Sequence, residues 1–360
     1  MILKNKYKDL EPIIEALQGS ILYSATLSNI ENAHTNIWNT LATIAPGHVF
    51  KLLTGEDATA DLEFFREKNN IDLTIKHGDD TWIIEHKLKD SAKPTQLNGY
   101  AQPNCKHVLV TLFEPYGKPK DYWHTTNYTD LSTRLADFQL MGDPQLTAEF
   151  QGYKSIVEAL SRLAEVLKED LSIGKYDYVG RPKTLALELL GQIKFDVPYI
   201  KYRTSKLTYL LYEAAKKRYG ESVVYCGSKD ANERDIFVDW KYMNTGPIID
   251  LGLKLTADVA IYVQIQGNSI GYGVEANNFK QIASRLKENE ILFERWYKTK
   301  NGKNEYYKFG NFAKQAYQLF PNIDEECLIA CAIEMFDELK QREQELSCIV
   351  SESGHGETDK

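Results

Sequence analysis

Two short apolar runs, separated by a turn of glycine and aspartate, place the strongest constraint on how this chain folds. The runs cover residues 71–75 and 81–87, and both contain the isoleucine and threonine that favour β-strands. Two such runs joined by a short polar turn are typical of a β-hairpin. We therefore expect residues 70–87 to form two neighbouring antiparallel strands around which the surrounding region is organised.

The hairpin carries two acids and one lysine at positions that would bring their side chains close together. Glu85 and Lys87 are two residues apart at the end of the second strand, so they project to one face, about 6 to 7 Å apart along the backbone. His86, between them, points to the other face. Asp72 lies near the start of the first strand. The hairpin therefore predicts two carboxylates and one ammonium group converging on one spot.

Two carboxylates on neighbouring strands suit Mg²⁺, which prefers hard oxygen ligands and keeps several of its waters. We expect Asp72 and Glu85 to hold the metal, with the backbone carbonyl of His86 as a further ligand. The metal would polarise a phosphate and acidify a bound water, while the Lys87 ammonium holds the nucleophile and balances negative charge. Such a site hydrolyses phosphodiesters. The alternative is a strand that merely ends in solvent, which is frequent for Glu-x-Lys in a chain that is 26% charged.

Composition limits the classes of protein to which the chain can belong. Its 360 residues, 43% of them apolar, are enough for one elaborated domain or two ordinary ones. No run approaches the roughly 18 apolar residues that span a bilayer, and the charged N-terminus lacks the apolar segment of a signal peptide, so we expect a cytoplasmic protein without membrane association. Five scattered cysteines indicate neither a disulfide framework nor a zinc site. The net charge of −8 disfavours polyanions, so any nucleic-acid surface must be local.

Around the hairpin, apolar periodicity predicts the local order helix, strand, strand, strand, helix, strand. The first helix runs from about residue 28 to residue 44, and a strand at residues 62–65 precedes the hairpin. A short helix at residues 96–101 and a strand at residues 106–112 follow it. This order marks the first 140 residues as one domain.

Past that point the pattern is less specific. A glycine- and proline-containing segment at residues 141–152 predicts a break, which is followed by helical segments and then by mostly β segments. Residues 259–274 predict a second hairpin, and the segments 311–320 and 325–345 predict closing helices. The expected domains are residues 1–140 as a core, 141–220 as a helical extension, 221–350 as a mixed α/β region of unknown role, and 351–360 as a disordered tail.

Two polar residues at the start of the first helix have open roles. Glu31 lies in the first turn, where the helix dipole favours an acid, but it also lies close to the apolar flank of the helix. His34 is a lone histidine on a helix, a position where a structural hydrogen bond is more common than a ligand bond. The residues alone leave both choices open.

Taken together, the motifs from about residue 31 to residue 131 resemble the PD-(D/E)xK nuclease superfamily. The similar branch has a Glu-x-x-His-Ser/Thr helix, an Ile-Asp strand, a Glu-x-Lys strand and a Gln-x-x-x-Tyr helix. Their order and spacing together are far more specific than any one motif. The corresponding pieces are Glu31-Asn32-Ala33-His34-Thr35, Arg66, Ile71-Asp72, Ile83-Ile84-Glu85-His86-Lys87, Gln96-Leu97-Asn98-Gly99-Tyr100, Val110-Thr111-Leu112 and residues 123–128.

The resemblance implies an α/β (α+β) fold: a restriction-endonuclease-like αβββαβ core with a mixed central sheet, followed by a helical and mixed α/β C-terminal region. In such a core Asp72 and Glu85 bind Mg²⁺ or Mn²⁺, with the His86 carbonyl nearby, and Lys87 serves the attacking water. Glu31 corresponds to the additional acid that completes the metal sphere or binds a second metal. We prefer this interpretation of Glu31 to the capping role.

The resemblance also implies roles for residues around the core. Gln96 would join the catalytic residues, and Tyr100 would line the site, where they orient the catalytic lysine or contact DNA. Lys89 and Lys93, which follow the catalytic strand, are assigned to DNA contact. His86 stands where many relatives carry asparagine, but its side chain faces away from the site, so we expect little effect on the metal.

A basic and aromatic segment at residues 295–308 is a second candidate for nucleic-acid contact. Lys298, Lys300 and Lys303 are interleaved with aromatic residues, a combination suited to phosphate contact and base stacking. The alternative is a solvated hairpin with an aromatic inner face.

The second hairpin partly repeats the acidic pattern of the first. Asp258 precedes it and Glu275 ends it, but Asn277 stands where the lysine would be. Because asparagine cannot supply the charge of a lysine, we interpret this repetition as architectural.

We expect a Mg²⁺-dependent DNA endonuclease that hydrolyses phosphodiester bonds with a metal-activated water. The alternatives are a nuclease that acts on RNA, and a catalytically inactive nuclease-fold protein that regulates by binding DNA or protein. The acidic balance mildly favours the inactive protein, whereas the intact set of acids and lysine speaks against it. A homodimer would allow both strands to be cut, and the identity of any other protein partner is unknown from the sequence. A role in DNA restriction or phage-related defence is analogy with the family alone.

Overall fold

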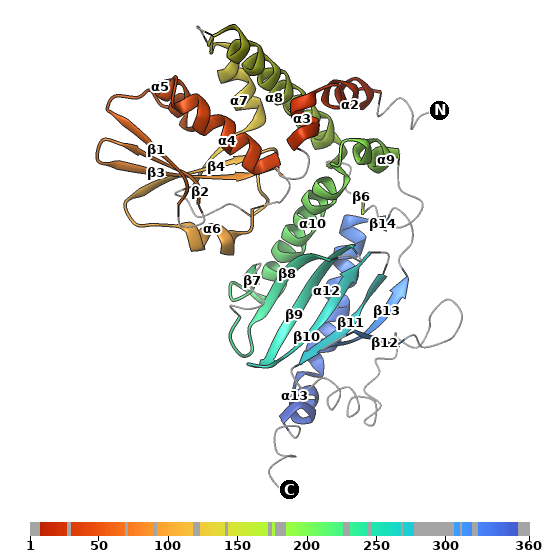
Figure 1. Cartoon of the computed structure of the whole chain (residues 1–360). Helices are drawn as coiled ribbons and strands as arrows, with labels where there is room; N and C mark the ends of the chain where they lie inside the picture. The colour runs from red at the N-terminus through yellow and green to blue at the C-terminus, as the bar shows by residue number, and fades with distance from the viewer. Residues whose placement is uncertain are drawn as a thin grey trace, which may run out of the picture. The chain divides into compact units, whose positions relative to one another are not determined.

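The computed structural model divides the chain into two compact units, and each unit is mixed α/β with its own main sheet (Figure 1). The first comprises Met1–Ile173 with Lys183–Arg203, and the second comprises Gly174–Pro182 with Thr204–Lys360. The mixed α/β class is therefore confirmed. The structure describes residues 8–26, 30–68, 71–88, 92–117, 123–140, 143–171, 175–176, 185–225, 231–243, 246–267, 269–276, 306–309, 312–318 and 323–351.

The first unit is built on a five-stranded sheet with the order β1-β2-β3-β4-β5. The pairs β1–β2 and β2–β3 are antiparallel, whereas β3–β4 and β4–β5 are parallel. The predicted hairpin is thus confirmed as β2–β3, with Leu73 opposite Ile84. The strands are β1 (Leu62–Lys68), β2 (Ile71–His77), β3 (Asp80–Lys87), β4 (Cys105–Thr111) and β5 (Trp123–Asn127).

Helices cover both faces of this sheet, which is why strand β4 is buried without alternation from His107 to Thr111. Helices α4 and α5 lie over one face and α6 over the other (Figure 1). Helix α5 was not expected, because its initial proline resembles a stop although proline is favoured at a first helical position. The helices are α2 (Leu10–Gln18), α3 (Ile21–Thr26), α4 (Ile30–Ala42), α5 (Pro46–Thr54), α6 (Pro94–Tyr100), α7 (Tyr128–Ala136), α8 (Pro144–Leu171) and α9 (Leu185–Gln192).

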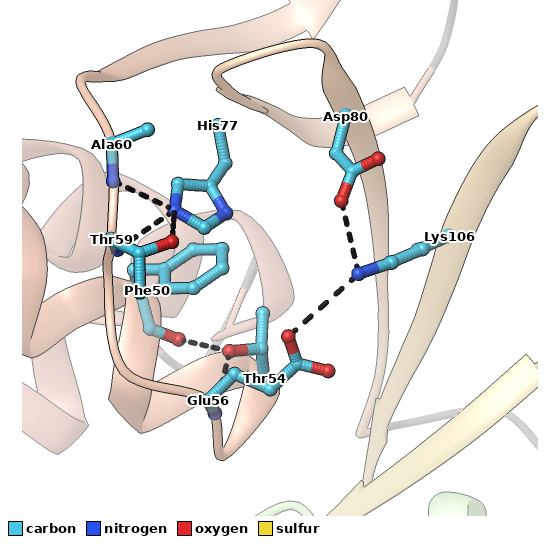
Figure 2. A network of polar contacts seen from close by, with 8 residues as sticks. All are labelled: Phe50, Thr54, Glu56, Thr59, Ala60, His77, Asp80 and Lys106. Atoms are coloured by element: carbon cyan, nitrogen blue, oxygen red, sulfur yellow. Dashed lines mark hydrogen bonds and ion pairs between the residues drawn. The ribbon is translucent and has the colours of Figure 1, made fainter.

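A polar network fastens the hairpin turn at the end of the sheet where β3 begins (Figure 2). The Nε2 atom of His77 accepts hydrogen bonds from the backbone N–H groups of Thr59 and Ala60, at 3.0 and 3.2 Å. Lys106 Nζ lies 3.0 Å from the carboxylate of Asp80. The hydrogen bonds join the loop after α5 to the end of β2, and the ion pair joins β4 to the start of β3. Both therefore hold the hairpin at the end away from Glu85 and Lys87.

The second unit contains a seven-stranded sheet with the order β12-β13-β11-β10-β9-β8-β7. One face of the sheet carries an apolar core that packs against side chains of α10 (Asp196–Tyr219) and α12 (Glu325–Gln341). The division between the two units falls within α10. The other elements are β6 (Lys175–Tyr176), β7 (Val224–Tyr225), β8 (Ile236–Met243), β9 (Gly246–Thr256), β10 (Val259–Gln266), β11 (Ser269–Ala276), β12 (Tyr306–Phe309), β13 (Phe312–Gln318), β14 (Ile323–Asp324) and α13 (Glu343–Ser351).

Several sequence expectations outside the hairpin are corrected. The expected helix at residues 311–320 is wrong, because Phe312–Gln318 forms strand β13, which pairs with both β11 and β12. The expected break at residues 141–152 is also wrong, since α8 begins at Pro144 and continues through Gly152. Strand β9 was not expected. In each case pairing or packing with distant segments outweighs local propensity.

The predicted second hairpin is confirmed as β10–β11. The domain boundaries expected at residues 140, 220 and 350 stay predictions, because a compact set of contacts does not establish an independently folding domain. The tail beyond Ser351 lies outside the described residues. Among the helices that the structure describes, none is long and apolar enough to cross a membrane.

Candidate active site

The predicted site forms where the hairpin brings the start of β2 beside the end of β3. Because Leu73 pairs with Ile84, Asp72 stands next to Glu85 across the two strands. Glu85 and Lys87 share a face, as expected, and the side chain of His86 lies on the other. Local alternation thus positions the acids and the lysine together.

Glu85 and Lys87 form a close, buried ion pair. Lys87 Nζ lies 2.6 Å from Glu85 Oε1, and the two side chains are 12% and 3% exposed. Burial raises the pKa of Glu85 to about 7, an effect that Lys87 opposes and that the neighbouring Asp72 and Glu31 reinforce. Glu85 Oε2 is buried and accepts no hydrogen bond from any residue that the structure describes. Within that part of the chain, one carboxylate oxygen is therefore paired with the lysine and the other has no partner.

Lys87 carries a full charge at neutral pH. Burial alone would lower the pKa of its ammonium group, but the carboxylates of Glu85, Glu31 and Asp72 together outweigh burial and raise it. The backbone carbonyl of Lys87 is also fixed, because it accepts a hydrogen bond from the hydroxyl of Tyr202, on α10, at 3.3 Å. Lys87 is thus a fixed cation rather than a free base.

Asp72 and Glu31 accept hydrogen bonds from the backbone at the end of β3. The N–H of His86 donates to Asp72 Oδ2, and the N–H of Leu88 donates to Glu31 Oε1, each at 2.8 Å. Backbone N–H groups two residues apart in an extended chain point to the same side. Both carboxylates therefore lie along one edge of the strand end, and Glu31, expected either as a cap or as part of the site, belongs to it.

The imidazole of His86 anchors the strand from the opposite face. Its Nδ1 lies 3.2 Å from the carbonyl oxygen of Glu31, which can only accept, so Nδ1 carries the proton. Burial lowers the pKa of His86 to about 3, although the bond to Glu31 opposes this, so the ring is neutral. Its Nε2 must then accept from the hydroxyl of Tyr128, 2.9 Å away.

The role of His34, which the sequence left open, is structural. Its Nδ1 lies 3.2 Å from the hydroxyl groups of both Tyr128 and Tyr153. Complete burial, with the proximity of His86, lowers the pKa of His34 well below its usual value. Trp38 Nε1 donates to the Tyr153 hydroxyl at 2.7 Å. His34 therefore belongs to a buried polar network that joins α4, α7 and α8 beneath strand β3.

Helix α6 packs on the sheet face that carries Glu85. Gln96 Nε2 donates weakly to the Tyr100 hydroxyl at 3.4 Å, which confirms that the two share a helix face. Tyr100 is partly buried against a cluster that includes Ile83 and Leu109. Within the described part of the chain, no hydrogen bond or ion pair joins Gln96 to the acids or to the lysine. The catalytic role of Gln96 stays a prediction.

The residues expected to contact nucleic acid are mostly beyond what the structure describes. Lys93 is half-buried and stands directly before α6 as its N-cap residue. Lys89, Lys298, Lys300 and Lys303 lie outside the described residues, so their expected DNA contacts stay predictions.

The sequence assigned no role to two tyrosines that hydrogen bond to the catalytic strand. Tyr128 and Tyr202 are almost fully buried and hydrogen bond to His86 and to the Lys87 carbonyl. Tyr202 lies 115 positions from Lys87, so no local pattern connects them. The nearest available signal was the Asn-x-x-Asp capping box that starts α7 at Tyr128.

The described residues include no group of three or more His, Cys, Asp or Glu side chains placed to hold a metal ion. Comparison with known proteins adds nothing to this picture: no family model, no curated protein and no solved structure matches the chain.

Proposed function

We propose that this chain is a cytoplasmic, metal-dependent nuclease that hydrolyses phosphodiester bonds in DNA. The observation that carries the proposal is the buried Glu85–Lys87 pair at 2.6 Å, with Asp72 and Glu31 fixed beside it at the end of β3. Burying two charges is unfavourable unless they are paired and hydrogen bonded, so a strand end that merely enters solvent has no reason to adopt this arrangement.

The arrangement of elements supports a restriction-endonuclease-like core. In chain order the core would be α4, β1, β2, β3, α6 and β4, with antiparallel pairing up to β3 and parallel pairing from β3 to β4. Apart from the additional helix α5 between α4 and β1, this order and the mixed sheet agree with the αβββαβ core that the motif resemblance implies, which supports the proposal. The proposed site lies where the hairpin meets the parallel part of the sheet.

The donor set fits a hard divalent cation. Oε2 of Glu85 is a buried carboxylate oxygen without a hydrogen-bond partner among the described residues, and a cation would satisfy it. Mg²⁺ is usually held by one or two carboxylates with several waters, so Asp72 and Glu85 suffice even without a three-residue cluster. Glu31 and the His86 carbonyl are the further candidates. A bound Mg²⁺ or Mn²⁺ supplies polarisation of a phosphate and acidification of a bound water.

The protein residues then have distinct tasks. Lys87, whose pKa is raised, remains an ammonium group, so it orients the attacking water and balances negative charge on the phosphate rather than accepting a proton. Asp72 and Glu31 fix the strand end through the N–H groups of His86 and Leu88. His86 and Tyr128 hold the same strand from the other face.

Cleavage by the purified full-length chain tests the proposal. We expect nicking of supercoiled plasmid DNA with Mg²⁺ or Mn²⁺, and loss of cleavage by at least about a hundredfold in Asp72→Asn and Lys87→Ala, because removal of one preorganised charge-stabilising group typically costs about 2.7 to 4 kcal/mol of transition-state stabilisation. Lys241→Ala, in the second unit, is the matched control and should cleave like the wild type.

Two outcomes would contradict the proposal. If the wild type cleaves neither DNA nor single-stranded RNA with either metal, the inactive regulator is the better interpretation, and the net charge of −8 already favours it mildly. If Asp72→Asn and Lys87→Ala cleave as well as the wild type, the activity belongs to another site. Cleavage of RNA alone would keep the metal chemistry and change the substrate.

A further inference from the structure

A mostly apolar cavity of about 700 Å³ lies in the first unit, among α3, α4 and α8 and the turn after α2. Its walls include Ile37 and Leu41 of α4 and Phe150 and Ile156 of α8. Small-molecule sites typically enclose about 300 to 1,000 Å³ and are lined mainly by apolar side chains with a few polar groups. The cavity has the size and the lining of such a site.

Two features show that the cavity is more than imperfect packing. Ile21, on α3, lines it and is 87% exposed, which is unusual for a large apolar side chain. Gly152, an exposed residue inside α8, lines it, and a Cβ atom placed there would meet no described atom within 4 Å. Neither close packing nor a positive φ requires this glycine, which is less favourable than alanine in a helix by about 1 kcal/mol. A side chain at this position has open space beside the cavity.

The charge of the residues that line the cavity favours a cationic ligand over an anionic one. Glu149 is the one charged residue among those that line the cavity in the described part of the chain, and it is exposed. A phosphate or another anion would face this carboxylate without a compensating cation, whereas a cation would be attracted to it. The cavity is therefore unsuited to a nucleotide and is distinct in chemistry from the acid and lysine site.

We propose that this cavity binds a small organic cation with an apolar body, whose rings or chain fill the space beside Gly152 and whose positive end lies near Glu149. The proposal is independent of the nuclease function, since binding is measured directly. The cavity adjoins the network beneath β3, because Tyr153 lines its wall while the hydroxyl of the same residue accepts from Trp38 and contacts His34.

Titration with berberine, a fluorescent aromatic cation, tests the proposal on nucleic-acid-free full-length protein. We expect saturable one-to-one binding, weakened about tenfold or more in Gly152→Phe, because the added ring occupies the cavity. Gly152→Ala is the matched control and should bind like the wild type, since one methyl group fills little of the space. Glu149→Gln should weaken berberine binding severalfold.

Thermal unfolding separates a filled cavity from a damaged fold. Gly152→Phe should keep the wild-type melting temperature, because the helix loses a glycine and no backbone lies within reach of the new Cβ. The proposal is overturned if wild type shows no saturable binding, or if folded Gly152→Phe binds berberine as well as wild type. It is also overturned if sedimentation shows a dimer that Gly152→Phe dissociates, because a second copy would then occupy the cavity.

Discussion

The hairpins β2–β3 and β10–β11 carry acids at similar positions, but these acids lie in different environments. In β2–β3, Glu85 is buried and pairs with Lys87 on its own strand. In β10–β11, Glu275 is exposed, and Asp258 lies in the turn before β10. Asn277, which stands in the place of the lysine, lies outside the described residues. Acidic spacing alone therefore does not identify a site; burial beside a paired lysine is what distinguishes the first hairpin.

A second comparison concerns the buried carboxylate in each sheet. Burial raises the pKa of Asp250, on β9, to about 6, although Lys241 and a 2.6 Å hydrogen bond from Gln264 oppose the shift. Lys241 Nζ lies 3.6 Å from Asp250, and its side chain is 40% exposed. Lys87, by contrast, is 12% exposed and 2.6 Å from its acid. Both acids are buried, but the lysine partner is buried only in the first sheet.

We expect the largest loss of stability from replacement of Lys87, because both this lysine and its acid are buried. Lys87→Met leaves an unpaired buried carboxylate and should lower the free energy of unfolding at pH 8 by about 3 to 5 kcal/mol. Lys241→Met removes a solvent-screened partner and should cost no more than about 1 kcal/mol. Denaturant unfolding of both variants measures the difference. Equal losses of stability in the two variants would contradict this expectation. The loss in Lys87→Met should be smaller at pH 5, because Glu85 is protonated there.

A smaller effect is expected from Asp250 and depends on pH. Its pKa is higher in the folded protein than in the unfolded chain, so the stabilisation is present below about pH 4 and is lost as the pH rises through about 6. Asp250→Asn should therefore raise the free energy of unfolding at pH 8 by about 2 to 3 kcal/mol and leave it unchanged at pH 4. Glu85→Gln should bring no such gain, because it strips Lys87 of its partner. A pH-independent effect of Asp250→Asn would contradict this account.

The smallest expected difference concerns two buried tyrosines. Tyr128→Phe removes the donor to His86 Nε2 and should cost about 1 to 3 kcal/mol, because a buried acceptor is left unsatisfied. Tyr262→Phe should be neutral or slightly stabilising, since the Tyr262 hydroxyl is buried and makes no hydrogen bond in the described part of the chain. Thermal unfolding of the two variants provides the measurement. A loss in Tyr262→Phe as large as that in Tyr128→Phe would mean that this hydroxyl has a partner.

Local patterns predicted the hairpin, the helix before it and the common face of Gln96 and Tyr100, because each depends on neighbours within a few residues. They failed for β13 and for the start of α8. The segment from Phe312 to Gln318 is a strand because two other strands pair with it, and Pro144 is the start of a helix rather than a break. Glycine and proline mark a boundary only where no helix or sheet continues across them.

The sequence by itself determined that Glu85 and Lys87 share a face, because side chains on a strand alternate with a period of two whatever the fold. It also determined that Asp72 stands near them, because a short turn sets the register of a hairpin. Only the tertiary structure decided that the pair is buried and that His86 is held by Glu31 and Tyr128, which lie 55 and 42 positions away. Contacts over such separations depend on the packing of whole helices against the sheet, and no local periodicity encodes them.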